Sequence, residues 1–86
     1  TTARTVADWL VSRVRERREL YQDDAVAEIE RRFGTRFLYD NANGNLAISR
    51  EVLREFTRLT TEDIVWIRTE RMWRKRERGD DPGRQQ

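Results

Sequence analysis

The stretch FLYDNANGNLAIS, residues 37–49, gives the clearest indication of structure in this sequence. Apolar residues alternate on both sides of three asparagines and one glycine, a pattern typical of a β-hairpin. Asparagine and glycine adopt positive φ angles and bond to nearby backbone at little cost, so turn formation explains them better than ligand binding does. Because an isolated two-stranded hairpin is barely stable in water, its apolar face is expected to lie on helices.

Two registers of this hairpin fit the sequence. A two-residue turn would pair Tyr39 with Ile48, whereas a four-residue loop would pair Tyr39 with Leu46. The two registers differ by an even number of residues, so the same side chains point inward in both. The inward face is predicted to carry Phe37, Tyr39, Leu46 and Ile48.

Helical periodicity flanks the hairpin on both sides. Apolar residues at helical spacing follow Thr5 and precede Gly34, a residue type that commonly ends helices. Ser49 is a typical N-cap for a third helix, and a fourth is expected over residues 61–78. The expected fold class is therefore α+β, with four helices around one two-stranded antiparallel hairpin in the order α-α-β-β-α-α. The length predicts a single domain over residues 1–86.

The composition indicates a thin hydrophobic core. The chain is 40% charged and 36% hydrophobic, so a domain of this size is stable only if its apolar residues are well placed. The residues expected in the core are Trp9, Leu10, Val14, Val26, Ile29, Phe33, Phe37, Tyr39, Leu46, Ile48, Val52, Leu53, Phe56, Leu59 and Val65.

Two missing residue types limit the chemistry. The sequence contains no histidine and no cysteine, which excludes Ser-His-Asp and Cys-His catalysis and cysteine-based metal sites. The acidic doublets lie at expected helix starts or in the tail, where capping and solubility account for them. We therefore expect no enzyme, no catalytic or metal-binding residues and no cofactor. No apolar run approaches the ~20 residues that span a bilayer, and no signal peptide is visible, so a cytoplasmic protein without a membrane partner is expected.

The expected fourth helix is apolar on two sides. At ~100° per residue its two tryptophans fall on one side, whereas Ile64 and Ile67 fall near the opposite side. Because a helix that is apolar all round is buried all round, a second copy of the chain is expected to cover the second side. We predict a small non-catalytic module that self-associates through this C-terminal helix as a homodimer, with Glu62 or Asp63 meeting the partner's arginines. The residues predicted near the contact are Trp66, Ile67, Met72 and Trp73.

The same helix concentrates positive charge. Residues 64–86 carry 7 basic and 4 acidic side chains, whereas residues 1–63 carry 11 basic and 12 acidic ones. All the basic residues except Lys75 are arginines, which suit bidentate contacts to phosphates. The alternative function is therefore binding of nucleic acid or another anionic partner. The candidate residues for this contact are Arg68, Arg71, Arg74, Lys75 and Arg78.

Two helices followed by a hairpin superficially resemble a winged helix. In that arrangement the second predicted helix would enter the major groove. That helix presents acidic residues, including Asp23, Asp24 and Glu28, which is a poor surface against a polyanion. Major-groove recognition is therefore rejected, and binding through the expected fourth helix is retained as the alternative.

Two stretches resemble a known family: RRFGTRFLYDNANGNLAISREVLREFTRLT, residues 31–60, and DIVWIRTERMWRKRERGDDPGRQQ, residues 63–86. Their FG pair, Asn-rich hairpin, Val-Leu-x-x-Phe helix and Trp-Arg-x-Arg end are similar to a family of small uncharacterised bacterial proteins. Some members of that family are carried as integron gene cassettes. The resemblance covers about residues 20–86 and implies no established activity. Because Pro-Gly-Arg at 82–84 matches the family pattern, the tail over residues 79–86 is expected to dock rather than fray.

Overall fold

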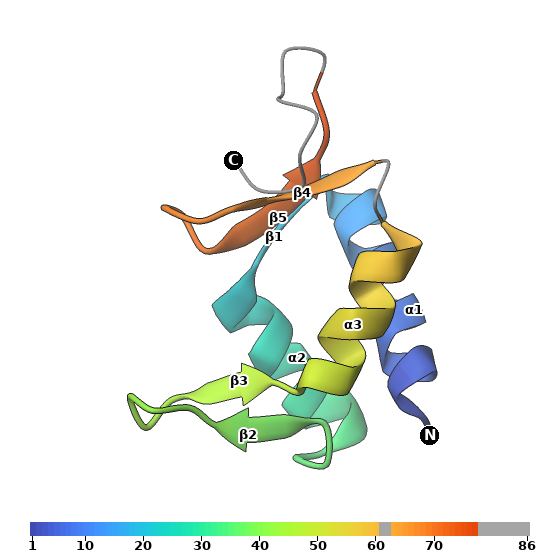
Figure 1. The fold of residues 1–86 in the computed structure, drawn as a ribbon. Coiled ribbons are helices and arrows are strands. Elements are labelled where there is room, and N and C mark those ends of the chain that lie inside the picture. The colour runs from blue at the N-terminus through green and yellow to red at the C-terminus, as the bar shows by residue number, and fades with distance from the viewer. Residues whose placement is uncertain (61–62, 78–86) are drawn as a thin grey trace.

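The computed structural model describes residues 1–60 and 63–77, and Figure 1 shows their arrangement. Within these residues the fold is α+β, with three helices and five short strands in two antiparallel sheets. In chain order the elements are α1 (Ala3–Arg17), β1 (Glu19–Tyr21), α2 (Gln22–Phe33), β2 (Leu38–Asp40), β3 (Leu46–Ile48), α3 (Arg50–Leu59), β4 (Ile64–Ile67) and β5 (Met72–Lys75).

The prediction of four helices around one hairpin is wrong. Residues 64–75, expected within the fourth helix, form the hairpin β4–β5, and residues 19–21, expected as a connector, form β1. These strands make a three-stranded sheet in the order β1-β5-β4, so β5 is the central strand. Figure 1 shows this sheet and the β2–β3 hairpin at opposite ends of the helices.

The apolar run of β4 is a strand whose first two residues are covered on both faces of the sheet. Ile64 and Val65 are both fully buried, although consecutive side chains of a strand point to opposite faces. Met72 and Trp73 of β5 are likewise both 5% exposed. A strand buried on both faces reads as a continuous apolar run without alternation. That run has the same appearance as a short helix that is apolar all round, which is why the sequence pattern misled.

One face of the three-stranded sheet contributes to the main core. Trp73 lies opposite Leu20 on one side and Trp66 on the other. The ring of Trp73 lies 5.2 Å from that of Phe56 on α3, measured between centroids. α1 packs mainly on α3 and also contacts β1 and β5. The aromatic row therefore joins the sheet to the helices.

Most of the predicted core residues are inside the protein. Those that are buried are Leu10, Val14, Val26, Ile29, Phe37, Ile48, Val52, Phe56 and Val65. Those that pack on the core while partly buried are Trp9, Phe33, Leu53 and Leu59. The sequence missed several buried residues, among them Leu20, Leu38, Ile64, Met72 and Trp73.

The register of the Asn-rich hairpin differs from both predictions. Leu38 lies opposite Ile48 and Asp40 lies opposite Leu46, a register midway between the two that were expected. A shift of one residue turns a side chain toward the other face of the ladder. Tyr39, predicted to point inward with Ile48, is accordingly on the other face and is 43% exposed. Leu46 shares the face of Ile48 but lies at the end of the strand next to the turn, and it is 38% exposed.

The asparagines of this hairpin form its turn, as predicted. The Oδ1 atom of Asn41 accepts hydrogen bonds from the backbone N–H groups of Asn43 (2.9 Å) and Asn45 (3.1 Å). The N–H of Gly44 donates to the carbonyl of Asn41 at 3.0 Å, and Gly44 has a φ of +78°. Glycine adopts that conformation without steric cost. The three-residue loop produced by these bonds sets the observed register.

The helix ends follow known capping chemistry. The Ser49 side chain accepts a hydrogen bond from the N–H of Val52, and Gly34 ends α2 with a φ of +79°, both as predicted. α1 begins earlier than expected because Thr2 is its N-cap, accepting from the N–H of Thr5 at 3.2 Å. In the part of the chain that the structure describes, the helices are too short or too polar to cross a bilayer.

Candidate nucleic-acid interface

The exposed face of α3 carries three arginines on one stripe. Val52 and Phe56 bury the opposite face of this helix in the core. Arg50, Arg54 and Arg58 are four residues apart, so they lie on one side and extend about 12 Å along the helix axis. The α3 face is defined as the residues that line the shallow hollow there, Arg50, Leu53, Arg54, Thr57 and Arg58.

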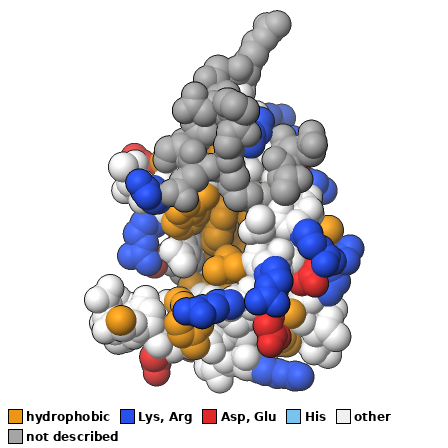
Figure 2. Space-filling view, in the orientation of Figure 1, with side chains coloured by type: hydrophobic (Ala, Val, Ile, Leu, Met, Phe, Trp, Pro, Cys, Tyr) orange, Lys and Arg blue, Asp and Glu red, His pale blue; other side chains and the backbone are white. Residues whose placement is uncertain are grey.

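Two of these arginines keep their charge unneutralised. Arg58 lies 3.1 Å from a carboxylate oxygen of Glu55 on the same helix. Within residues 1–60 and 63–77, no acidic side chain lies at ion-pair distance from Arg50 or Arg54. Figure 2 shows basic side chains gathered over α3, beside a central apolar area. An arginine without an acidic partner retains its hydrogen-bonding capacity for an anionic ligand.

A second hollow adjoins the α3 face and shares Arg50 with it. Its lining also includes Arg36, Tyr39, Ser49 and Glu51. The guanidinium of Arg36 lies over the ring of Phe37, 5.3 Å from its centroid. The arginines of the two hollows therefore form a continuous surface from the loop before β2 to the end of α3.

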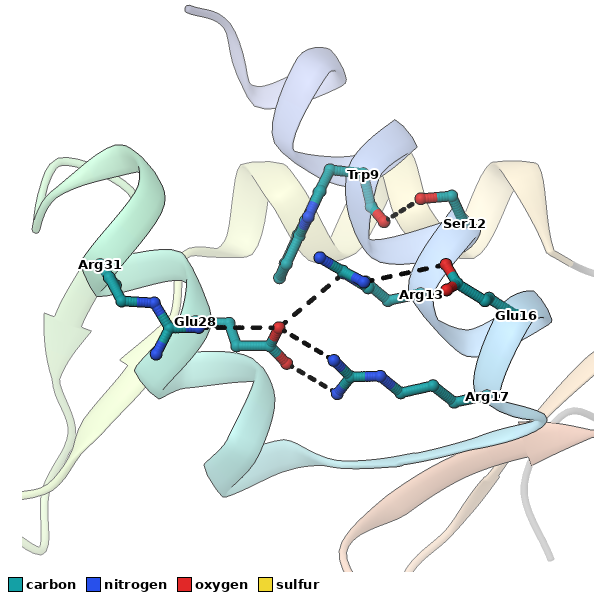
Figure 3. A network of polar contacts seen from close by, with 7 residues as sticks. All are labelled: Trp9, Ser12, Arg13, Glu16, Arg17, Glu28 and Arg31. Carbon is teal, nitrogen blue, oxygen red and sulfur yellow. Dashed lines mark hydrogen bonds and ion pairs between the residues drawn. The ribbon is translucent and has the colours of Figure 1, made fainter.

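A different arginine cluster joins α1 to α2. Figure 3 shows Arg13 and Arg17 of α1 and Arg31 of α2 directed at Glu28, which is only 8% exposed. Arg17 binds both carboxylate oxygens, at 3.0 and 3.3 Å. Arg13 and Arg31 lie 3.8 and 4.0 Å from the same carboxylate. These arginines balance a nearly buried charge, so this Glu28 cluster serves the packing of the helices.

The predicted anion-binding residues do not form one surface. Arg68 and Arg71 are exposed in the turn between β4 and β5, where Arg71 donates to Gln22 at 3.3 Å. Arg74 and Lys75 are consecutive residues of β5, so their side chains point to opposite faces of the sheet. Arg78 lies outside the described residues. Their helical spacing was misleading because the segment is a hairpin.

The residues predicted at the dimer contact also do not form one exposed surface. Met72 and Trp73 are buried within the chain, whereas Trp66 and Ile67 are partly exposed on β4, an edge strand of the sheet. Asp63, expected to meet a partner's arginine, instead binds Arg15 at 2.9 Å within the chain, and Glu62 lies outside the described residues. The C-terminal helix on which the contact was placed is therefore absent from residues 64–75.

The sequence interpretation missed the arginines of α3. Their four-residue spacing is visible in the sequence, but Glu51 and Glu55 alternate with them, so the segment does not stand out as basic. A count of charge over long segments does not show which arginines lack an acidic partner. Only the structure shows that Arg50 and Arg54 lack one in the described part of the chain. Within the described residues, no group of three or more acidic side chains is arranged to hold a metal ion.

A protein-family model, "Family of unknown function (DUF6953)", matches residues 2–75. The chain belongs to this family. The DUF6953 match begins at the N-cap of α1 and ends at the last residue of β5, so it covers the folded elements described above. It stops before the Pro-Gly-Arg segment that contributed to the resemblance seen in the sequence. No curated protein and no solved structure matches the chain.

Proposed function

We propose that this domain binds nucleic acid through the α3 face. The observation that carries the proposal is the pair Arg50 and Arg54, which lie on one exposed helical stripe without an acidic partner in the described part of the chain. Arginines elsewhere on the helices, such as Arg4 and Arg15, are bound to carboxylates. The net charge of the chain is only +2, so its total charge does little to attract a polyanion. What favours binding is the local positive charge of those arginines that have no acidic partner among the described residues.

The order of elements supports this proposal. α1, β1, α2, α3 and the hairpin β4–β5, with β1 paired to β5, follow each other as in winged helix-turn-helix domains. The hairpin β2–β3 is an addition between α2 and α3. In this arrangement α3, and not the acidic α2, takes the place of the recognition helix. The objection to major-groove recognition assumes that the second helix enters the groove, and the acidic residues behind that objection are on α2, not on α3. Likeness of fold alone does not fix function.

The side chains of the α3 face suit a duplex. Arginine can bind a phosphate or the O6 and N7 atoms of guanine with two hydrogen bonds. Leu53 and Thr57 line the same hollow beside the arginines and offer apolar contact of the kind made to a thymine methyl group. The turn arginines Arg68 and Arg71 are proposed to contact the sugar-phosphate backbone outside the groove.

Fluorescence anisotropy with a labelled DNA duplex tests the proposal. Replacing both key arginines, Arg50→Ala/Arg54→Ala, should weaken binding by about tenfold or more and reduce the slope of log K against log salt by about 1.8. The matched control is Arg4→Ala/Arg31→Ala, which removes the same charge from exposed positions of α1 and α2. Its affinity should fall by less than about threefold. Equal losses in both variants, or no binding by the unmodified protein, would contradict the proposal.

Self-association is the second candidate function. It is favoured by the partly exposed Trp66 and Ile67 on β4, because an edge strand can pair with another strand. We propose a homodimer in which this strand, and not a helix, lies at the contact. Sedimentation at increasing protein concentration should show dimers that Ile67→Lys abolishes. A monomer of 10.4 kDa at every concentration would contradict it.

The proposed setting is the cytoplasm of a bacterium, where a non-catalytic binding domain without cofactors would act. The similarity to proteins carried on integron cassettes stays a prediction.

A further inference from the structure

The hollow beside the amino end of α3 has the chemistry of an anion site. Arg36 and Arg50 both line it, and within the described residues neither has an acidic side chain at ion-pair distance. Arg36 is held by its contact with the ring of Phe37. A guanidinium stacked on an aromatic ring loses less freedom when it binds a ligand, because its plane is already oriented.

Two hydroxyl groups add hydrogen-bond donors to the same hollow. The Ser49 oxygen accepts from the N–H of Val52, which leaves its own O–H free to donate. Tyr39 is 43% exposed on β2 and lines the hollow, and its hydroxyl is a second donor group there. The register found for the β2–β3 hairpin thus explains why Tyr39 is outside the core. Glu51 is also in the lining and opposes an anion there.

We infer that this hollow binds a phosphate group. Each arginine can donate two parallel N–H bonds, and each hydroxyl can donate one O–H bond. A phosphate group can accept all of them because it has several acceptor oxygens. The inference rests on the proposed function, since the phosphate is that of the nucleic-acid backbone next to α3. A phosphate held at this point would fix the position of α3 along the duplex, because backbone contacts set register while base contacts set sequence preference.

Two substitutions in the lining of the hollow should change the duplex affinity in opposite directions. Arg36→Ala should weaken binding of the labelled duplex by about fivefold, by a similar factor for unrelated sequences, and lower the salt slope by about 0.9. Glu51→Gln should strengthen binding by about threefold, since it removes the opposing charge. Arg32→Ala is the matched control: Arg32 also lies over an aromatic ring, that of Trp9, at 5.8 Å, but outside the hollow. It should leave the affinity unchanged.

A second measurement separates the backbone phosphate from free phosphate. Inorganic phosphate and then the duplex are titrated while the side-chain Nε–H signals of the arginines are followed by NMR. Shifts of the Arg36 and Arg50 signals with both ligands support the inference. Shifts with inorganic phosphate alone would support a phosphate site but contradict its role on nucleic acid. If Arg50→Ala/Arg54→Ala abolishes duplex binding while Arg36→Ala leaves it unchanged, the inference of a phosphate site in the hollow is wrong. The proposal that the α3 face binds nucleic acid then stands. If neither variant alters duplex binding, the phosphate site and the proposed function are both wrong.

Discussion

On α1 and α2 the arginines surround a carboxylate, whereas on α3 they face solvent. Arg13 and Arg17 reach across to Glu28, which is nearly buried between the two helices. Arg50 and Arg54 occupy similar helical surfaces, but the described part of the chain offers them no acidic partner at that range. The residue type is the same in both regions, so the difference lies entirely in the neighbours.

This difference separates structural charge from charge available to a ligand. A carboxylate removed from water needs cations and hydrogen bonds around it, and the Glu28 cluster supplies them. The acidic residues on α3 leave Arg50 and Arg54 without such a partner, although Glu55 binds Arg58. If the comparison is right, substitutions in the first region change stability, and substitutions in the second change binding.

The largest expected effect comes from placing a carboxylate within the arginine stripe of α3. Arg54→Glu would place a negative charge four residues from both Arg50 and Arg58, on the same helical stripe. Duplex affinity should fall by about 100-fold, because a contact is lost and a like charge faces the polyanion. Stability should change by less than about 0.5 kcal/mol, because the favourable pairs with Arg50 and Arg58 are partly offset by repulsion from Glu51, three residues earlier. Unchanged affinity by anisotropy would show that the α3 face is only a solvated surface.

A smaller effect is expected in the Glu28 cluster. Glu28→Gln keeps the shape of the side chain but removes the charge that Arg13 and Arg17 share. Because these arginines remain partly exposed, the loss of stability should be about 1–2 kcal/mol, short of that for a fully buried pair. The melting temperature should fall by about 10 °C. Duplex affinity measured well below the transition should not change.

The control for this variant is Arg54→Gln, which removes a charge from the α3 face. Its stability by thermal denaturation should stay within about 0.5 kcal/mol of the unmodified protein. If Arg54→Gln melted lower than Glu28→Gln, the assignment of the two regions would be reversed.

The smallest effect concerns Arg71, which has a φ of +53° in the turn before β5. A left-handed conformation is costly for any residue with a Cβ atom, so Arg71→Gly should raise stability by about 0.5 kcal/mol after the loss of the exposed bond to Gln22. Thr69→Gly, in the same turn without a positive φ, should lower it by a similar amount. Denaturant titration can measure the free energy of unfolding of both variants. A loss of stability in Arg71→Gly would mean that the side chain holds the turn.

The sequence predicted those elements whose signals are local. Ser49 and Gly34 mark helix ends by their own chemistry, and the Asn-rich hairpin is defined within a few residues. β4 and β5 could not be predicted in this way, because the turn between them contains no glycine, proline or asparagine. Its left-handed position is occupied by Arg71. β1 is three residues long and exists only because β5 pairs with it.

The candidate site was predictable only in part. The spacing of Arg50, Arg54 and Arg58 indicates a common face once the helix is known. Which arginines are neutralised depends on contacts between distant residues, such as Arg17 with Glu28 and Arg15 with Asp63. No periodicity in the sequence encodes those pairings, since they follow from how α1 lies against its neighbours.

The position of β5 has a consequence for the synthesis of the protein. Among the described elements, the central strand of the sheet is the last in chain order, and its partner β1 comes from residues 19–21. Leu20 therefore leaves the ribosome well before Trp73, its partner in the finished sheet, is available to pair with it. Until then the helices carry uncovered apolar surface. Folding is expected to be completed after translation of β5, so chains ending before Met72 should be substrates for chaperones and proteases.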